Sequence, residues 1–393
     1  MPVAHKIAEF IERSSWIRAM FEAGAKLKAE KGAENVFDFS LGNPNIEPPE
    51  KFFEVVARLA ADRTPGRHAY MPNAGYPQVR AKVADYLSRE HGPGFSENEI
   101  IMTVGAAGAL NIVLKAIVDP GAEVVVPTPY FVEYDFYLDN HGGSVKRVPT
   151  TDTFELDIAA MAYAISEKTC AVLINNPNNP TGAVYTQESV DALAAMLTEK
   201  SKQLGKAIYL ISDEPYRQIV FDGLHVPSIF AAYPNSIVVT SFSKNLSLPG
   251  QRIGYAAVHP QIADKGMLIG GMTLANRILG YVNAPGIMQL AVAELLDDAA
   301  EVAEYARKRE LILGVLDEAG YEYVRPGGAF YVFPKAPIPD DVAFCKLAIE
   351  QNLLLVPGSG FMGPGYCRIA YCCDDATIIN SLEAFKKAKA AAK

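Results

Sequence analysis

Lys244 stands in the stretch SFSKNLSLPGQRIGY, where small and hydroxyl residues surround it and Arg252 follows eight positions later. A lysine becomes a nucleophile near neutral pH when burial or a neighbouring cation removes its proton. Most lysines are instead solvated surface charges, and this stretch alone does not distinguish the two interpretations. The decision depends on which other residues the fold brings to Lys244.

The segment GAAGALNIVLKAI places backbone groups directly after the apolar run IIMTV. Gly105, Ala106 and Ala107 would expose N–H groups at the start of a helix, which suits an anion such as phosphate. The segment matches neither of the two common glycine-rich phosphate motifs, so an ordinary helix start explains it equally well.

Two further segments end apolar runs with polar residues: NNPNNPTG, which contains Asn179, and SDEPY, which contains Asp213 and Tyr216. An asparagine-rich turn or a helix-capping aspartate would explain either segment by itself. In α/β sheets, however, ligands bind beyond the carboxyl ends of the strands, where successive strand ends meet. Together with Arg252, these residues favour a nucleophilic Lys244 in a cleft.

The elements that would position these residues alternate between β and α patterns from about residue 95 to 260. Helical patterns such as residues 108–118 and 189–205 separate the β-rich runs, and Gly205 is a typical helix end. Several runs are apolar on both faces, as in parallel strands covered by helices. We therefore predict an α/β fold whose large domain has a mainly parallel, seven-stranded sheet between helices. The runs are EIIMTV, AEVVVPTP, SVKRVPT, CAVLINNP, AIYLISDE, SIVVTSF and IGYAAV.

After Pro285 the pattern changes to strands beside helices, which predicts a smaller α+β domain. With 393 residues the chain is long for a single core, which supports two domains. The N-terminal helix could pack on either domain. Our boundaries are 1–45 for an N-terminal segment of the small domain, 46–287 for the large domain and 288–393 for the C-terminal small domain. Within the last part, residues 286–320 read as one long helix, 321–326 and 329–334 as strands, and 341–351 as a helix before a final one.

The composition excludes several classes of function. The formal net charge is −9 without a basic run, which argues against nucleic-acid binding through counterion release. Five cysteines, odd in number and bunched late, do not form a disulfide framework, and no long apolar segment opens the chain. We expect a cytoplasmic protein. The sequence contains no HExxH or GxSxG motif, and its six histidines are scattered, so we expect no metal site.

Taken in order, these motifs resemble the class I/II, fold-type I aminotransferases that use pyridoxal phosphate (PLP), the family that contains aspartate aminotransferases. The resemblance runs from SLGNPN to GYCRIAYC and includes AYMPNAGYPQVR, TVGAAGAL, PTPYFVEY, NNPNNPTG, SDEPY and SFSKNLSLPGQRIGY. It implies a PLP enzyme that moves an amino group from an L-amino acid to a 2-oxo acid with ping-pong kinetics.

The resemblance also implies roles in holding PLP. Lys244 would bind the cofactor as a Schiff base and then carry protons, and Asp213 would keep the pyridine nitrogen protonated. Tyr216 and Asn179 would donate to the phenolic oxygen, while Phe131 would stack on the ring, where relatives often have tryptophan or tyrosine. The phosphate would be held by Arg252, Ser241, Ser243 and the N–H groups of Gly105, Ala106 and Ala107.

For the substrate, the resemblance implies that Arg368 in GYCRIAY grips the α-carboxylate through a bidentate pair. Asn179 and the backbone at Gly42 would flank that carboxylate. Tyr70 matches a tyrosine that reaches the phosphate of the neighbouring subunit, which implies a homodimer with shared active sites.

Aspartate is the amino donor that we expect first, with alanine or an aromatic amino acid as alternatives, and 2-oxoglutarate is the expected acceptor. Some relatives that prefer dicarboxylates carry a lysine near the phosphate loop, and GAAGAL lacks one. Lys115, or Arg277 or Arg67 from a neighbouring subunit, could supply the missing cation.

Two other functions fit the same scaffold, because a fold does not fix its chemistry. One is a PLP-dependent C–S β-lyase. The other is a regulator without enzymatic activity, which would need a DNA-binding domain. We do not expect such a domain ahead of SLGNPN, which the chain reaches by residue 41.

Overall fold

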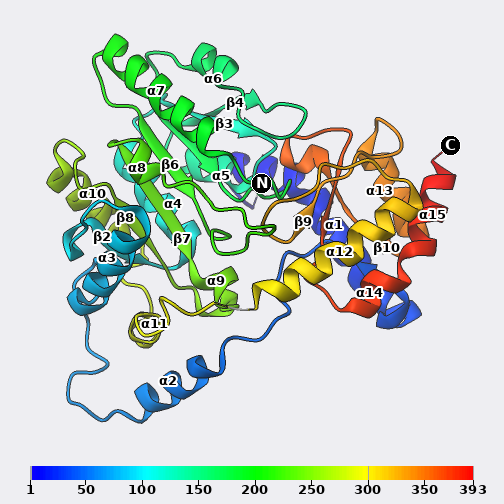
Figure 1. Cartoon of the computed structure of the whole chain (residues 1–393), viewed down its shortest axis with the longest axis horizontal. Coiled ribbons are helices and arrows are strands. Elements are labelled where there is room, and N and C mark those ends of the chain that lie inside the picture. The colour runs from blue at the N-terminus through cyan, green and yellow to red at the C-terminus, as the bar shows by residue number, and fades with distance from the viewer. Residues whose placement is uncertain (1, 300, 393) are drawn as a thin grey trace.

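The computed structural model describes residues 2–299 and 301–392, and of residues 12–23 and 25 it describes the backbone. Its central feature is a seven-stranded sheet with the strand order β2-β8-β7-β6-β5-β3-β4 (Figure 1). Strands β7, β6, β5, β3 and β4 run parallel, and β8 is antiparallel to both of its neighbours. The mainly parallel, seven-stranded sheet is confirmed, because each predicted run overlaps one strand. They are β2 (Ile100–Thr103), β3 (Glu123–Thr128), β4 (Ser144–Pro149), β5 (Thr169–Asn175), β6 (Tyr209–Asp213), β7 (Ser236–Ser241) and β8 (Gly254–Val258).

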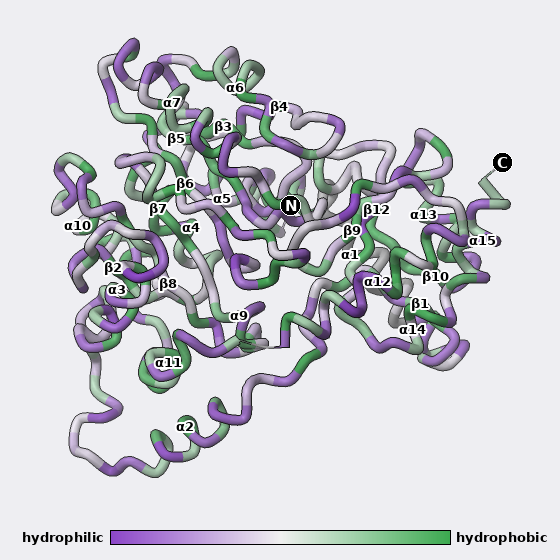
Figure 2. Tube along the Cα trace, viewed as in Figure 1, coloured by the Kyte–Doolittle hydropathy of each residue, from purple (hydrophilic) through white to green (hydrophobic). Residues whose placement is uncertain are grey.

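Side chains alternate between the two faces of the sheet, so each strand contributes to two cores. Along β6, Leu210 packs into one core and Ile211 into the other. Figure 2 shows hydrophobic residues along the central strands and hydrophilic residues on the outer turns. Helices α3 (Pro77–His91), α6 (Ile158–Ala164), α7 (Gln187–Leu204) and α8 (Ile229–Ala232) cover the first face, and α4 (Gly105–Ile117), α5 (Glu133–Asn140) and α10 (Lys265–Ile278) cover the second.

Helix α7 begins and ends as its sequence predicts. The side chain of Thr186 accepts a hydrogen bond from the backbone N–H of Ser189, which caps the first turn. Gly205 ends the helix in the left-handed conformation with a φ of 64°.

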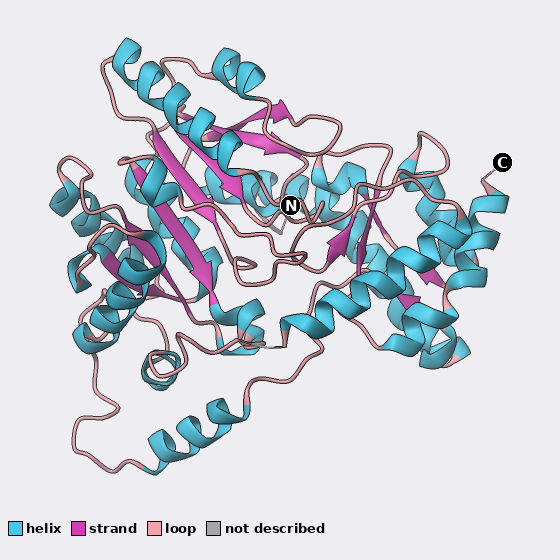
Figure 3. Cartoon of the chain, in the orientation of Figure 1, coloured by secondary structure: helices cyan, strands magenta, loops and turns pink. Residues whose placement is uncertain are grey.

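A smaller α+β domain follows, with its own core of residues such as Leu316, Phe330, Phe344 and Phe385. Its strands β11, β12 and β9 form an antiparallel sheet, and Figure 3 shows these short strands apart from the large sheet. The elements are α12 (Val302–Ala319), β9 (Tyr331–Val332), α13 (Asp341–Glu350), β10 (Leu353–Leu354), β11 (Val356–Pro357), β12 (Cys367–Ala370), α14 (Asp375–Asn380) and α15 (Leu382–Ala391).

The N-terminal segment contacts both parts of the fold. Helix α1 (His5–Lys31) packs Phe10 against Phe136 of α5, with ring centroids 4.8 Å apart. Strand β1 (Phe37–Asp38) then pairs in parallel with β10 of the smaller domain. Helix α2 (Glu50–Ala61) lies at the margin of the molecule (Figure 1), where it packs against α11.

The single long helix predicted for residues 286–320 is wrong. The chain instead forms α11 (Gly286–Val292) and, after a break, α12 (Val302–Ala319). The apolar pattern continues across the break because Leu295 and Leu296 are buried in the core of the large sheet, whereas α12 packs in the second core. Two different cores thus produce what reads as one helical stripe.

The strand predicted for residues 321–326 is also wrong, because these residues lie outside every strand of the described chain. Tyr321 packs its ring against Phe344 and Phe385, with centroids 6.2 and 5.5 Å away. Its hydroxyl donates to the carbonyl of Phe385 at 3.1 Å. The apolar pattern here comes from side-chain packing rather than from a backbone ladder.

Candidate active site

The candidate site lies at the carboxyl ends of the parallel strands. The register pairs Asn175 at the end of β5 with Asp213 at the end of β6, and Ser241 at the end of β7 with Gly254. A cavity of about 490 Å³ opens at this edge. The predicted site residues that line it are Gly42, Ala106, Ala107, Phe131, Asn179, Asp213, Tyr216, Ser241, Ser243, Lys244, Arg252 and Arg368.

Lys244 enters the cavity from α9 (Phe242–Asn245), a single turn that begins directly after β7. Its Nζ donates to the carbonyl of Gly42 at 2.6 Å and lies 5.3 Å from the ring centroid of Phe330. Burial lowers the pKa of Lys244 to about 8, and the nearby Arg368 and Arg252 add to this effect. A substantial fraction of the amine is therefore neutral just above neutral pH, as a nucleophile requires.

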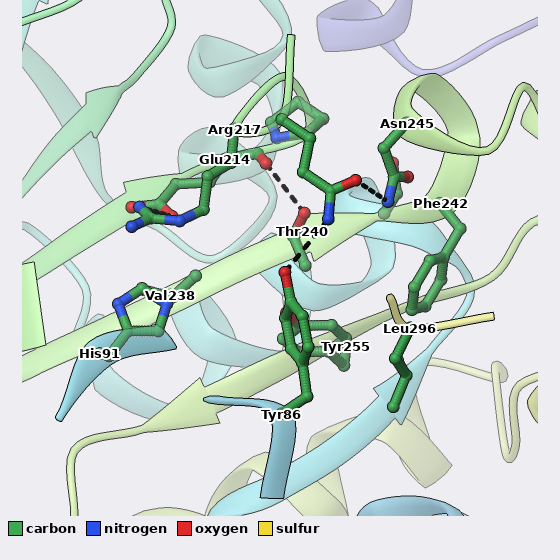
Figure 4. A pocket seen from close by; sticks show the side chains of 13 residues that line it. Tyr86, His91, Glu214, Arg217, Val238, Thr240, Phe242, Asn245, Tyr255 and Leu296 are labelled. Atoms are coloured by element: carbon green, nitrogen blue, oxygen red, sulfur yellow. Dashed lines mark hydrogen bonds and ion pairs between the residues drawn. The ribbon is translucent and has the colours of Figure 1, made fainter. Parts of the chain in front are cut away.

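A second cavity of about 30 Å³ adjoins the site and holds a chain of polar side chains (Figure 4). Asn245, the residue after Lys244, donates from Nδ2 to Gln218 at 3.1 Å. Gln218 in turn donates to the hydroxyl of Tyr86 at 3.1 Å, so Asn245 and Tyr86 stand at the two ends of the chain. These bonds fix the turn that carries Lys244.

Asp213 is a buried carboxylate that lacks a cation. Only 6% of it is exposed, and one oxygen accepts a hydrogen bond from the hydroxyl of Tyr134 at 2.7 Å. The other oxygen, Oδ1, is buried without a partner. Burial raises the pKa of Asp213, the bond from Tyr134 opposes the rise and the nearby Glu214 adds to it, and together they bring the pKa to about 7. A ligand that offers a protonated ring nitrogen would complete this carboxylate.

The first turn of α4 and Arg252 form a site for an anion. Gly105 begins α4 with a φ of +78°, and a Cβ placed there would lie 2.9 Å from Nη2 of Arg252. Ala106 and Ala107 follow in the first turn, where helical N–H groups have no partner within the helix. The guanidinium and the helix start together suit a phosphate group.

Arg368, on β12, is held in a fixed plane. Its two terminal nitrogens donate to Asn179 Oδ1 at 3.2 Å and to the carbonyl of Ser40 at 2.7 Å. Its Cζ lies 4.8 Å from the ring centroid of Tyr331 and 4.6 Å from that of Phe361. Nε is buried and unpaired. This arrangement presents a preformed, partly unsatisfied guanidinium to a carboxylate.

Two predicted residues do not line this cavity. Gly105 stands beside Arg252 at its border, as described above, and Tyr70 is 94% exposed. Tyr70 lines a separate surface hollow of about 310 Å³ with neighbours that include Tyr281.

The three cations suggested for a side-chain carboxylate are also absent from the cavity lining. Lys115 and Arg277 are exposed, and Arg67 forms an ion pair with Asp62. The cations that line the cavity, within the described chain, are Lys244, Arg252 and Arg368.

Sequence reasoning missed several residues of the site. Tyr134 donates to Asp213, and Tyr331 contacts Tyr216 and Arg368. Asn175 donates to the carbonyl of Asp213 at 2.8 Å. Glu133 and Tyr137 also line the cavity. The motif PTPYFVEY contains Tyr134 and Glu133, but Asp213, the partner of Tyr134, is 79 residues away in sequence. The sequence could have indicated Tyr134 and Glu133 only by their place in this motif.

The described residues lack two further features. No helix there is long and apolar enough to cross a membrane. No group of three or more histidine, cysteine, aspartate or glutamate side chains there could hold a metal ion.

Comparisons with known proteins agree with this geometry. The family model "Aminotransferase class I and II" matches residues 34–385. The aspartate/prephenate aminotransferase of Thermus thermophilus is 32% identical over 367 residues, which cover 92% of this chain and 93% of that protein. The aspartate aminotransferase of Pyrococcus horikoshii is 30% identical over 388 residues, which cover 96% and 95%.

Solved structures are equally similar. The crystal structure of an aminotransferase from Eubacterium rectale has a TM-score of 0.95 at 39% identity and covers 99% of this chain and 98% of that one. The Thermus thermophilus aspartate aminotransferase with maleate has a TM-score of 0.85 at 31% identity and covers 95% and 96%. The chain therefore belongs to the class I and II aminotransferase family and is a PLP-dependent transaminase.

Proposed function

We propose that this enzyme transfers the amino group of an L-amino acid, aspartate first, to a 2-oxo acid such as 2-oxoglutarate by a ping-pong mechanism. The observation that carries the proposal is the convergence of Lys244, Asp213 and Arg368 on one cavity. Asp213 and Arg368 each have one buried atom without a partner among the described residues, and Lys244 has a lowered pKa.

These unmet interactions fit PLP. Asp213 Oδ1 would pair with the pyridinium nitrogen, Lys244 would bind the aldehyde carbon, and Phe131 would stack on the ring. Tyr216 and Asn179 would donate to the phenolic oxygen. The phosphate would take Arg252, Ser241, Ser243 and the N–H groups of Gly105, Ala106 and Ala107. When bound, PLP withdraws electrons from the substrate Cα and stores the amino group between the two half-reactions.

The protein's own residues would perform three tasks. Arg368 would hold the α-carboxylate in a bidentate pair, with Asn179 and the backbone at Gly42 beside it, and so orient the bond from Cα to its hydrogen. Lys244 Nζ would take the proton from Cα of the amino acid and give it to C4′ of PLP, and it would move a proton in the opposite direction in the second half-reaction, because its lowered pKa suits both transfers near neutral pH. Because one 2-oxo acid leaves before the next binds, the kinetics would be ping-pong.

Aspartate leads because relatives that the chain covers almost fully are named aspartate or aspartate/prephenate aminotransferases. Alanine and aromatic amino acids are the alternatives, since the lining of the described chain offers no cation beyond the three with proposed roles. A cation for a second carboxylate would come from a neighbouring subunit, for which Arg277 and Arg67 are the candidates. Tyr70 would reach the phosphate of that subunit, and its exposure supports a homodimer with shared sites.

We also propose the division of the chain into residues 1–45 and 288–393 for the small domain and 46–287 for the large one. The separate cores support two domains, and they place Leu295 and Leu296 with the large one. A cytoplasmic location is part of the proposal.

The test is a panel of L-amino acids, each mixed with the PLP-loaded enzyme while the absorbance of the bound cofactor is followed. Aspartate should react fastest, and 2-oxoglutarate should reverse the change. Faster reaction with alanine or phenylalanine would replace aspartate as the donor, and release of pyruvate and ammonia from cystathionine would favour a β-lyase. Lys244→Ala should lack the visible absorbance and lose turnover by several orders of magnitude, whereas Lys115→Ala, on the surface of the same domain, should behave as wild type.

A further inference from the structure

Tyr331 lies between the two functional ends of the cavity, and none of the roles above uses it. It is on β9, is 2% exposed and lines the cavity. Its hydroxyl is 2.9 Å from that of Tyr216, and the two rings meet edge to face at 5.7 Å. The face of the same ring lies 4.8 Å from Cζ of Arg368. One side chain thus contacts both a proposed cofactor ligand and the proposed carboxylate ligand.

The two hydroxyls share one hydrogen bond, which leaves one hydrogen for the cavity. A phenol donates one hydrogen and accepts up to two. Burial raises the pKa of Tyr331 to about 12 and that of Tyr216 well above its usual value, so both keep their hydrogens. The bond can run in either direction, and when Tyr216 gives its hydrogen to the phenolic oxygen of PLP, Tyr331 must be the donor to Tyr216. With Tyr331 donating, the hydrogen of Tyr216 is free to point into the cavity.

The ring of Tyr331 has a second effect, on the plane of Arg368. Tyr331 and Phe361 both lie within 4.8 Å of its Cζ, and Asn179 and Ser40 fix its terminal nitrogens. Aromatic contacts hold a guanidinium by cation–π attraction and restrict its rotation. Loss of the ring would therefore loosen Arg368 even with its hydrogen bonds intact.

Gly42 leaves the space that the Tyr331 hydroxyl occupies. A Cβ at position 42 would overlap with that hydroxyl, so a glycine is needed there. The carbonyl of the same glycine accepts from Lys244 Nζ at 2.6 Å. The backbone at Gly42 thus contacts both Tyr331 and Lys244.

We propose that Tyr331 is a positioning residue that serves both ends of the site: its hydroxyl directs the hydrogen of Tyr216 into the cavity, and its ring holds the plane of Arg368. The inference rests on the proposed function, because it takes Tyr216 as a ligand of PLP and Arg368 as the ligand of the substrate carboxylate. The two effects use different atoms of one side chain, so two substitutions separate them.

The experiment compares Tyr331→Phe and Tyr331→Leu in the PLP-loaded enzyme with two readouts other than activity. The first is the apparent pKa of the visible absorbance of the bound cofactor. The second is the Kd of maleate, an unreactive dicarboxylate, by titration calorimetry. Tyr331→Phe should shift the apparent pKa by about half to one unit, the equivalent of one neutral hydrogen bond, and change the Kd less than about twofold. Tyr331→Leu should also weaken maleate by about tenfold.

Two further variants serve as controls. Tyr216→Phe should shift the same apparent pKa, and adding Tyr331→Phe to it should shift the pKa no further, because both act through one hydrogen bond. Tyr305→Phe removes a hydroxyl from another tyrosine that is buried in the same core and does not line the cavity, so it should leave both readouts unchanged.

A wild-type apparent pKa in Tyr331→Phe, or wild-type binding of maleate in Tyr331→Leu, would overturn the inference while leaving the proposed function in place. A wild-type enzyme that gains no visible absorbance with PLP would overturn the proposed function and the inference with it. Tyr331→Phe keeps the volume and the packing of the ring, so its result stands even where Tyr331→Leu does not fold.

Discussion

Replacing Lys244 with methionine should stabilise the cofactor-free protein, although it removes the proposed nucleophile. The folded protein holds the pKa of Lys244 at about 8 against an ordinary value of 10.5. Each pKa unit corresponds to about 1.4 kcal/mol, so burying the charged amine costs about 3 kcal/mol at pH 7. The hydrogen bond to Gly42 offsets about 1 kcal/mol of this cost. Lys244→Met should therefore raise the free energy of unfolding by about 2 kcal/mol at pH 7.

The sign of the pH dependence follows from the same lowered pKa. Below pH 8 the lysine is charged in both the folded and unfolded states, and the cost is fully present. Between about pH 8 and 10.5 the folded protein loses its proton first, so the cost falls and wild type gains on the variant. Urea unfolding of both cofactor-free proteins at pH 7 and at pH 9.5 measures the difference, which should nearly vanish at the higher pH.

A matched control is Lys115→Met, at an exposed lysine, which should change stability by less than about 0.5 kcal/mol at either pH. Addition of PLP should reverse the order, because the ligand stabilises the protein that binds it more tightly. The reasoning would be refuted by a Lys244→Met protein that is no more stable than wild type at pH 7, or by a gain that does not shrink at pH 9.5.

Three other substitutions test the remaining parts of the site. Asp213→Asn should retain PLP but slow the first half-reaction with amino acid by about a hundredfold or more, since it removes the buried charge that would face the ring nitrogen. Stopped-flow absorbance measures this rate, and an unchanged rate would contradict the proposed role of Asp213. Arg368→Lys should raise the KM for the amino acid by at least about tenfold, because a lysine cannot form the bidentate pair, and an equal loss with a substrate lacking the α-carboxylate would point to misfolding instead. Gly105→Ala should weaken PLP binding by about tenfold, since the added Cβ would crowd Arg252 and a φ of +78° strains an alanine. Fluorescence titration measures the affinity, and an unchanged value would show that the phosphate binds elsewhere.

The sequence predicted the sheet, and most of the residues it proposed for the site line one cavity, because both depend on local patterns. The central parallel strands β3, β5, β6 and β7 are short, mostly apolar runs, and their carboxyl ends lie at one edge of the sheet for topological reasons. Residues at such ends, including Asp213 and Lys244, could therefore be grouped from the sequence alone. The resemblance to a family then assigned their roles, which local patterns alone do not provide.

What the sequence did not predict depends on contacts between distant segments. The hydroxyl of Tyr134 donates to Asp213 from a position 79 residues away, and Tyr331 meets Tyr216 from 115 residues away. The break between α11 and α12 has the same origin, because its two sides are buried in different cores. Hydrophobic periodicity records that a face is buried but not which surface buries it.

The contrast between the cavity and buried charges elsewhere in the protein is itself an argument for a ligand. Outside the cavity, Glu99 accepts from Lys265 at 2.7 Å, and Lys308 donates to Asp375 at 2.9 Å. Glu214 has one unpaired oxygen, but its other oxygen is 2.9 Å from Arg217. In the cavity, the pKa of Lys244 is lowered, that of Asp213 is raised, and Asp213 Oδ1 and Arg368 Nε are both unpaired. A fold selected for stability alone would pair or remove such groups. A ligand with an aldehyde and a protonated ring nitrogen would satisfy Lys244 and Asp213, and the carboxylate of an amino acid bound beside it would satisfy Arg368. Filling the site would thus convert the destabilisation of the cofactor-free protein into binding and catalytic energy.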